Sequence, residues 1–131
     1  MYFLDTNILL EIALEQEKAD ITGTFLNKIK NANVFISDLS IHSIGIILFN
    51  NKKEETFISL TNELILNEVS VVAIPLEKLQ EVEKTSKEFK LDFDDAYQYC
   101  LAKTYSLQLI SFDKDFDRTD IKRKEPQELL P

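Results

Sequence analysis

Aspartates stand at the ends of several predicted strands in this chain. Asp5, Asp38 and Asp113 each come at the end of a short apolar run. In an open parallel sheet, ligands bind outside the carboxyl ends of the strands, so these three side chains are expected at one edge. Asp94 and Asp95 begin an apolar helical segment just before the last of those runs, and can point toward the same edge. The sequence therefore predicts several carboxylates in one cleft.

Such a cluster implies a bound cation. Two carboxylates about 4 Å apart repel by about 4 kcal/mol at an effective dielectric near 20. Protonation or a cation is needed to make the cluster tolerable. Mg²⁺ and Mn²⁺ bind oxygen ligands and keep several waters, which suits metal-assisted hydrolysis of a phosphodiester.

Each acid also has a purely structural interpretation. Asp5 can cap a helix, and Asp94 and Asp95 can lie in a first turn that the helix dipole favours. A helix needs only one cap, however, and a pair of like charges followed directly by Ala-Tyr is poorly explained by capping. Of the acids in segment 113–117, Asp113 is the best candidate ligand, whereas the others fit a solvated turn.

The elements that must position these acids follow from the hydrophobic pattern. Strands alternating with helices imply crossover connections and a mainly parallel sheet with helices on both faces, an α/β fold. Short apolar or β-branched runs predict strands at 2–4, 34–36, 69–74 and 108–112, and helical spacing predicts helices at 8–17, 21–30, 41–48, 57–65, 76–89 and 94–105.

Composition restricts the function. The 131 residues have 44% apolar content and only 2 Gly and 3 Pro, which predicts a single domain over 1–131 without a linker. A net charge of −8 excludes a uniformly basic surface for nucleic acid. The single Cys100 cannot form an internal disulfide, and no apolar run is long enough to span a bilayer, so a cytoplasmic location is expected.

Three segments resemble the acidic motifs of the PIN-domain family. They are Phe-Leu-Asp-Thr-Asn at 3–7, Asp-Phe-Asp-Asp-Ala-Tyr at 92–97, and Ile-Ser-Phe-Asp-Lys-Asp-Phe at 110–116, with Asp113 placed 18 residues after Asp95. Their order and spacing match the family across nearly the whole chain. The resemblance implies a three-layer α/β/α fold with a sheet of about four to five strands. It also implies a Mg²⁺- or Mn²⁺-dependent ribonuclease, typically the VapC-like toxin of a type II toxin–antitoxin pair.

The resemblance also implies roles for particular residues. Asp5, Asp95 and Asp113 match the family's catalytic metal ligands, and Asp94 and Asp115 are candidate auxiliary ligands. The side chains expected to orient a ligand or phosphate are those of Thr6, Asn7 and Ser37.

The sequence departs from the family on the helix after the second strand. The family usually has a glutamate there, and Ser43 occupies that position. Asp38, Asp94 or a water must then supply the missing oxygen, and weak or manganese-favouring activity is expected. The neighbouring His42 can be a general base or a ligand, but it equally fits an ordinary polar position on a helix.

The leading hypothesis is an endoribonuclease toxin in which metal-activated water hydrolyses RNA. A local basic stretch can contact the RNA backbone, although it also fits an ordinary solvated segment: Lys114, Arg118, Lys122, Arg123 and Lys124. The alternative is a catalytically weakened PIN-fold module that binds RNA or protein. A phosphoaspartate receiver domain is discounted because the acidic pair comes late in the chain.

Partners are predicted from apolar residues in the first two helices. The apolar surface of these helices is larger than a small sheet needs to cover it, so we expect part of it to be exposed around Ile8, Leu9, Ile12 and Phe25. That surface predicts a homodimer, a groove for an antitoxin, or both.

Overall fold

The computed structural model describes all 131 residues and contains one four-stranded sheet. The strands are β1 (Tyr2–Leu4), β2 (Val34–Ser37), β3 (Ser70–Val72) and β4 (Gln108–Ile110). They are all parallel, in the order β3-β2-β1-β4. The predicted α/β fold is therefore confirmed, with β1 and β2 in the centre of the sheet.

Six α-helices connect or flank the strands. The predicted helix at 8–17 ends early because the chain leaves the helix at Leu14 and Glu15 has a positive φ of 49°. The predicted helix at 76–89 begins as a separate 3₁₀ turn after Pro75. The elements are α1 (Thr6–Ala13), α2 (Ala19–Lys28), α3 (Asp38–Asn50), α4 (Glu54–Leu66), η1 (Leu76–Lys78), α5 (Leu79–Phe89), α6 (Phe93–Thr104), η2 (Lys114–Arg118) and η3 (Pro126–Leu129).

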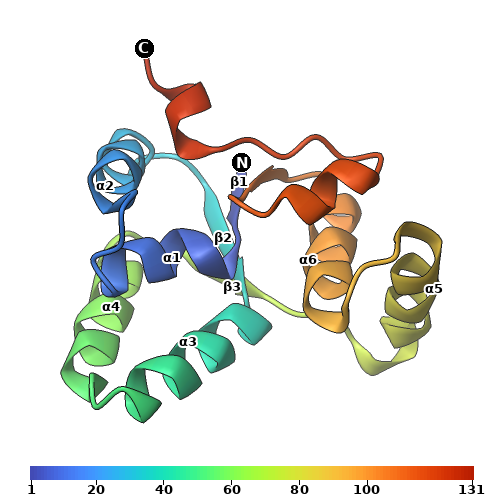
Figure 1. Cartoon of the computed structure of the whole chain (residues 1–131), viewed down its shortest axis with the longest axis horizontal. Coiled ribbons are helices and arrows are strands. Elements are labelled where there is room, and N and C mark those ends of the chain that lie inside the picture. Colours follow the sequence, from blue (N-terminus) through green and yellow to red (C-terminus); the bar gives the residue numbers. More distant parts are fainter.

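The helices form two layers, one on each face of the sheet (Figure 1). Alternate residues along a strand point to opposite faces. Phe3 and Leu109 accordingly pack with α5 and α6, whereas Leu4 and Ile110 pack with the layer of α1 to α4. This is the three-layer arrangement that the sequence predicted, and α6 is the deeply buried helix expected from its apolar circumference.

A residue at or shortly after the end of three strands caps the next helix. The Asp5 carboxylate accepts the Thr6 amide at the start of α1, and Ser37 Oγ accepts the Ser40 amide at the start of α3. The Asp113 carboxylate likewise accepts the Asp115 amide at the start of η2. Since the strands are parallel, these caps lie at the same edge of the sheet.

The expected apolar surface on the first two helices was largely wrong. Ile8, Leu9 and Phe25 are almost completely buried, because α1 and α2 cover one face of the sheet with these side chains. Only Ile12 of that set is half-buried.

None of the helices combines the length and apolarity needed to cross a membrane.

Candidate metal centre

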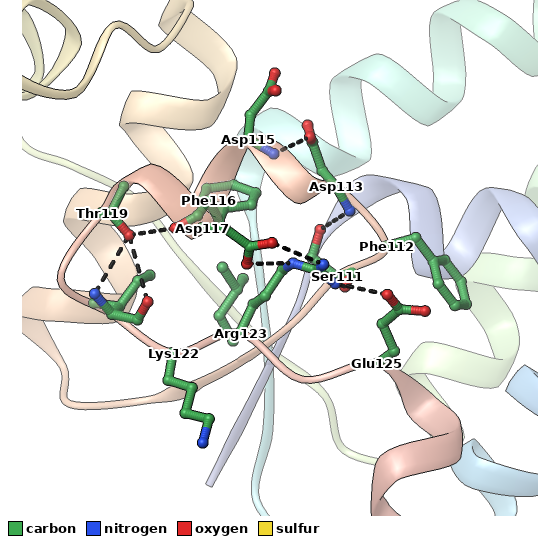
Figure 2. A network of polar contacts seen from close by, with 12 residues as sticks. Ser111, Phe112, Asp113, Asp115, Phe116, Asp117, Thr119, Lys122, Arg123 and Glu125 are labelled. Atoms are coloured by element: carbon green, nitrogen blue, oxygen red, sulfur yellow. Dashed lines mark hydrogen bonds and ion pairs between the residues drawn. The ribbon is translucent and has the colours of Figure 1, made fainter.

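Three carboxylates converge at the sheet edge. Asp95, Asp113 and Asp115 each offer an oxygen, and these oxygens all lie within 4.8 Å of one another. Asp95 lies in the first turn of α6, whereas Asp113 caps η2 and Asp115 lies within it. Figure 2 shows the bond from the Asp115 amide to Asp113 Oδ1, which is 2.8 Å long and holds the two acids on one turn.

A hydrogen bond and a buried side chain hold the turn that carries Asp113 and Asp115 in place. Ser111 Oγ accepts the Asp113 amide at 3.0 Å, and Phe116 is fully buried in the core. Behind the turn, the Arg123 side chain is only 10% exposed and binds Asp117 and Glu125 at 3.0 and 2.8 Å (Figure 2). These contacts favour one placement of the two acids.

Asp5 lies next to this cluster and is 5% exposed. Its Oδ1 accepts hydrogen bonds from the Thr6 amide at 2.9 Å and from Gln98 Nε2 at 3.0 Å. Its Oδ2 accepts from Ser111 Oγ at 2.6 Å and, more weakly, from Asn7 Nδ2 at 3.3 Å. Ser111 thus contacts both Asp5 and the Asp113 backbone, which couples β1 to the end of β4.

The electrostatics of the site disfavour the charged carboxylates. Burial, reinforced by the charges of Asp113 and then Asp92, raises the pKa of Asp95 to about 8. Burial also raises the pKa of Asp5, although the hydrogen bonds from Ser111 and Gln98 act in the opposite direction. A divalent cation at the cluster would reverse this preference by favouring the ionised forms.

A buried polar layer lies behind Asp5, and two of its members were not predicted from the sequence. Ser40 Oγ contacts Thr6 Oγ1 at 2.8 Å, Ser37 Oγ at 3.1 Å and Gln98 Nε2 at 3.0 Å. Gln98 is 1% exposed on α6. The available signal was a glutamine in the middle of the otherwise apolar segment 96–102.

Other candidate residues lie outside the group of three acids. Asp94 is exposed on α6, and His42 is exposed on α3. Asp38 Oδ1 accepts hydrogen bonds from the Tyr97 hydroxyl and the Leu39 amide, each at 2.8 Å. Ser43 is half-buried on α3 and makes no side-chain hydrogen bond.

The five basic residues have different environments. Arg118 donates to Asp115 at 2.9 Å and to the Lys90 carbonyl at 2.6 Å, which places its guanidinium beside the acid cluster. Arg123 is occupied by Asp117, Glu125 and the Ser111 carbonyl. The remaining three differ in exposure: Lys114 and Lys122 are exposed, and Lys124 is half-buried beside β4.

The donor set fits a hard divalent cation. All three converging groups are carboxylates, which are the ligands that Mg²⁺ and Mn²⁺ prefer. Burial and the neighbouring carboxylates raise the pKa of Asp95, so its negative charge is disfavoured unless a proton or a cation compensates it. A cation is the natural compensating group.

Comparisons with known proteins agree with this fold. The model of the PIN domain family matches residues 2–122. A search of the curated protein sequences finds no match.

Several solved structures are similar to the chain in fold. The VapC20 toxin of Mycobacterium tuberculosis, described as cleaving the sarcin–ricin loop, superposes with a TM-score of 0.79 at 15% identity, over 96% of this chain and 100% of that one. For VapBC2 of Rickettsia felis, bound to a promoter DNA fragment, the TM-score is 0.75 at 16% identity, over 95% and 96%. For a toxin–antitoxin complex from Klebsiella pneumoniae it is 0.66 at 18% identity, over 88% and 90%.

Proposed function

The chain belongs to the PIN domain family, a family of nucleases, and we propose that it is a metal-dependent endoribonuclease, the toxin of a type II toxin–antitoxin pair. The observation that carries this proposal is the convergence of Asp95, Asp113 and Asp115, with Asp5 buried beside them. The converging group contains no cysteine or histidine, so the proposed metal ligands are carboxylates.

The carboxylates would hold Mg²⁺ or Mn²⁺ at the sheet edge. When bound, such an ion supplies an activated water and positive charge opposite the developing charge on a phosphodiester. Asp95, Asp113 and Asp115 contribute the oxygens that converge, and Asp5 adds negative charge behind them. Ser111 connects Asp5 to the η2 turn, because its hydroxyl donates to the Asp5 carboxylate and accepts from the Asp113 amide.

Few cationic groups are available to hold an RNA backbone. The net charge of −8 leaves binding to the metal ion and to side chains close to it. Arg118 is the best placed, because its guanidinium already lies at the rim of the cluster and its side chain is about half exposed. The exposed Lys114 and Lys122 extend this positive edge, whereas the ion pairs of Arg123 favour a structural role for it.

An antitoxin segment is proposed to occupy a groove between α1, α2 and α4. The groove has a volume of about 470 Å³ and its lining is largely apolar, including Leu9, Ile12, Leu26, Leu60 and Leu64. The Klebsiella toxin–antitoxin complex, which shares the fold, supports a protein partner of this type. Leu60→Glu should abolish binding of the protein encoded in the adjacent reading frame while leaving RNA cleavage unchanged.

A second copy of the chain is proposed to cover the apolar residues exposed on α3 and α4. Ile46, Phe49 and Ile58 are each more than half exposed, and Ile65 is 73% exposed. Light scattering after size exclusion should give the mass of a dimer, and a monomer would contradict this part of the proposal.

The lone Cys100 is free and buried, which is compatible with the proposed cytoplasmic location.

The second candidate function is a catalytically weakened module that binds RNA or protein. It is favoured by Ser43, which offers no charge where the family usually has a glutamate. A cleavage assay separates the two: single-stranded RNA is incubated with purified protein and Mg²⁺, Mn²⁺ or chelator. Cleavage that needs a metal, fails in Asp95→Asn and persists in the exposed control Asp20→Asn, on α2, supports the enzyme. Binding of RNA without cleavage under either metal supports the module.

A further inference from the structure

Phe93 is an exposed aromatic residue at the start of α6. It is 56% exposed and belongs to neither of the two core clusters. It is also the first residue of the helix, two positions before Asp95. Single exposed apolar residues are common on protein surfaces, so the support and the surroundings of this ring decide whether it has a role.

The Phe93 ring lies against a firmly held partner. Its centroid is 5.8 Å from that of the Tyr97 ring, and the two planes are tilted by 43°. Tyr97 is buried, and its hydroxyl donates to Asp38 Oδ1 at 2.8 Å and accepts the Ile74 amide at 3.0 Å. These bonds join α6 to the start of α3 and to the chain after β3. A ring that is already held in place loses little conformational freedom when it binds a ligand.

Phe93 and the clustered acids lie on two sides of the same helix end. Phe93 and Asp95 are separated by about 3 Å along the helix axis and by about 200° around it. Asp95 converges with Asp113 and Asp115. Phe93 instead contacts Tyr97, and so faces the side of α3 and β3. A polynucleotide with one phosphate at the acid cluster can therefore bring a nearby base to Phe93 across the end of α6.

The charges around Phe93 decide which part of a nucleotide suits it. Asp92 and Asp94 flank it in the sequence, and both are exposed. A phosphate beside these carboxylates would be repelled, and the net charge of −8 offers no general attraction to offset that repulsion. A base is uncharged and planar, and it stacks on an aromatic ring largely irrespective of its identity. A base is therefore the group that fits this position.

We propose that Phe93 is a stacking surface for an unpaired base of the RNA substrate, in a nucleotide close to the phosphate that is hydrolysed. The inference rests on the proposed ribonuclease function and adds a substrate class to it. Bases in single-stranded segments can turn outward and stack on aromatic side chains, whereas paired bases are stacked within their helix. Phe93 is then a substrate-binding residue that takes no part in holding the ion.

The first experiment measures tryptophan fluorescence. The chain contains no tryptophan, so Phe93→Trp introduces a single fluorophore and keeps an aromatic face. A uridine dodecamer is added with Ca²⁺ in place of Mg²⁺, since Ca²⁺ also binds oxygen ligands. Its binding is measured separately by the fluorescence anisotropy of a labelled strand. The matched control is Tyr105→Trp, because Tyr105 is 45% exposed at the other end of α6.

The emission of Phe93→Trp should be quenched as the RNA binds, and that of Tyr105→Trp should not change. RNA that binds without quenching Phe93→Trp would overturn the inference and leave the nuclease proposal standing. The same strand paired with an adenosine dodecamer should cause no quenching. Quenching by that duplex would overturn the requirement for an unpaired base.

The second experiment compares the uridine dodecamer with an abasic ribose–phosphate strand of the same length. Phe93→Leu keeps an apolar side chain and removes the aromatic face. It should weaken binding of the dodecamer about 10-fold, which is within the range for stacking of one base on an aromatic side chain. Its effect on the abasic strand should be less than about twofold, because no base is present. Tyr105→Leu should bind both strands as the wild type does.

The outcomes separate stacking from other roles of Phe93. Equal weakening on both strands would show that Phe93→Leu acts through the fold, and unchanged affinity for the dodecamer would show that no base stacks there. Either result overturns the inference. Quenching of Phe93→Trp by the protein encoded in the adjacent reading frame, but not by RNA, would also overturn it in favour of a protein partner. A wild type that binds neither strand would overturn the RNA substrate on which the inference rests.

Discussion

Replacing Asp113 with asparagine should stabilise the protein without metal and remove its stabilisation by metal. Without a cation, the carboxylate oxygens of Asp95, Asp113 and Asp115 lie within 4.8 Å of one another. Two unit charges at that separation repel by about 3.5 kcal/mol at an effective dielectric near 20. Since Asp113 and Asp115 are only half-buried, water screens part of this repulsion, and we expect Asp113→Asn to gain about 1 to 2 kcal/mol.

The variant is chosen to keep the local structure. Asparagine retains an oxygen that can accept the Asp115 amide, and it caps helices about as well as aspartate does. The gain in stability should raise the melting temperature by about 4 to 8 °C in the presence of chelator. A metal that binds only the folded protein stabilises it by about 2.7 kcal/mol at a concentration 100 times its dissociation constant. The wild type should show that gain, and Asp113→Asn should lose most of it.

Scanning calorimetry at about pH 9 measures both the gain in stability in chelator and the loss of stabilisation by metal. At this pH Asp95, with its pKa of about 8, is largely ionised. Asp20→Asn is the matched control, since it removes one exposed charge from the first turn of a different helix, α2, outside the cluster. The reasoning is refuted if Asp113→Asn melts lower than the wild type in chelator. It is equally refuted if the variant keeps the full gain with Mg²⁺ or Mn²⁺.

Three further predictions concern pH, the missing glutamate and the support of the η2 turn. Because the folded-state pKa of Asp95 lies above its ordinary value of 3.8, the native state binds this proton more tightly, and the metal-free protein should lose stability as the pH rises from about 4 to about 8. Asp95→Asn should flatten that dependence in thermal melts from pH 5 to 9, and an unchanged slope would contradict the assignment. Ser43→Glu should strengthen Mg²⁺ binding and RNA cleavage if an acid is simply missing; no effect, together with loss of both in Asp94→Asn, would make Asp94 the substitute ligand. Arg123→Ala should lower the free energy of unfolding in urea by about 1 to 3 kcal/mol because it leaves acidic partners unpaired, whereas the exposed neighbour Lys122→Ala should change it by less than about 0.5 kcal/mol.

The fold could be predicted because its signals are local. Each strand is a short apolar or β-branched run, a capping residue follows three of the four strands, and the alternation with helices dictates a parallel sheet. The bounds of β1 were predicted correctly, whereas β4 ends at Ile110 rather than at 112. The pairing of these two parallel strands brings Asp5 and Asp113 to one edge. The edge strand β3 is shorter than predicted: Val69 and Ile74 lie outside it, and the Ile74 amide donates to the Tyr97 hydroxyl rather than to a strand.

The side-chain detail of the site was harder to predict. Successive residues of a helix point about 100° apart, so only one of the pair Asp94 and Asp95 can face the cluster, and the sequence does not say which. Asp115 joins the cluster because η2 turns it back toward the Asp113 carboxylate, whereas the sequence favoured a solvated turn. Gln98 and Ser40 meet across α6 and α3, 58 positions apart, and no local pattern indicates that contact.

The central claim is that carboxylates at this sheet edge hold a divalent ion that activates water to hydrolyse RNA. It is tested most directly by the chemistry of the cleaved ends, measured by mass spectrometry after reaction with Mg²⁺ or Mn²⁺ in ¹⁸O-labelled water. Attack by water predicts a terminal phosphate that carries one ¹⁸O from the first product onward, no 2′,3′-cyclic phosphate, and no product with Asp95→Asn or with chelator. A cyclic phosphate, or cleavage that continues in chelator, would contradict the account.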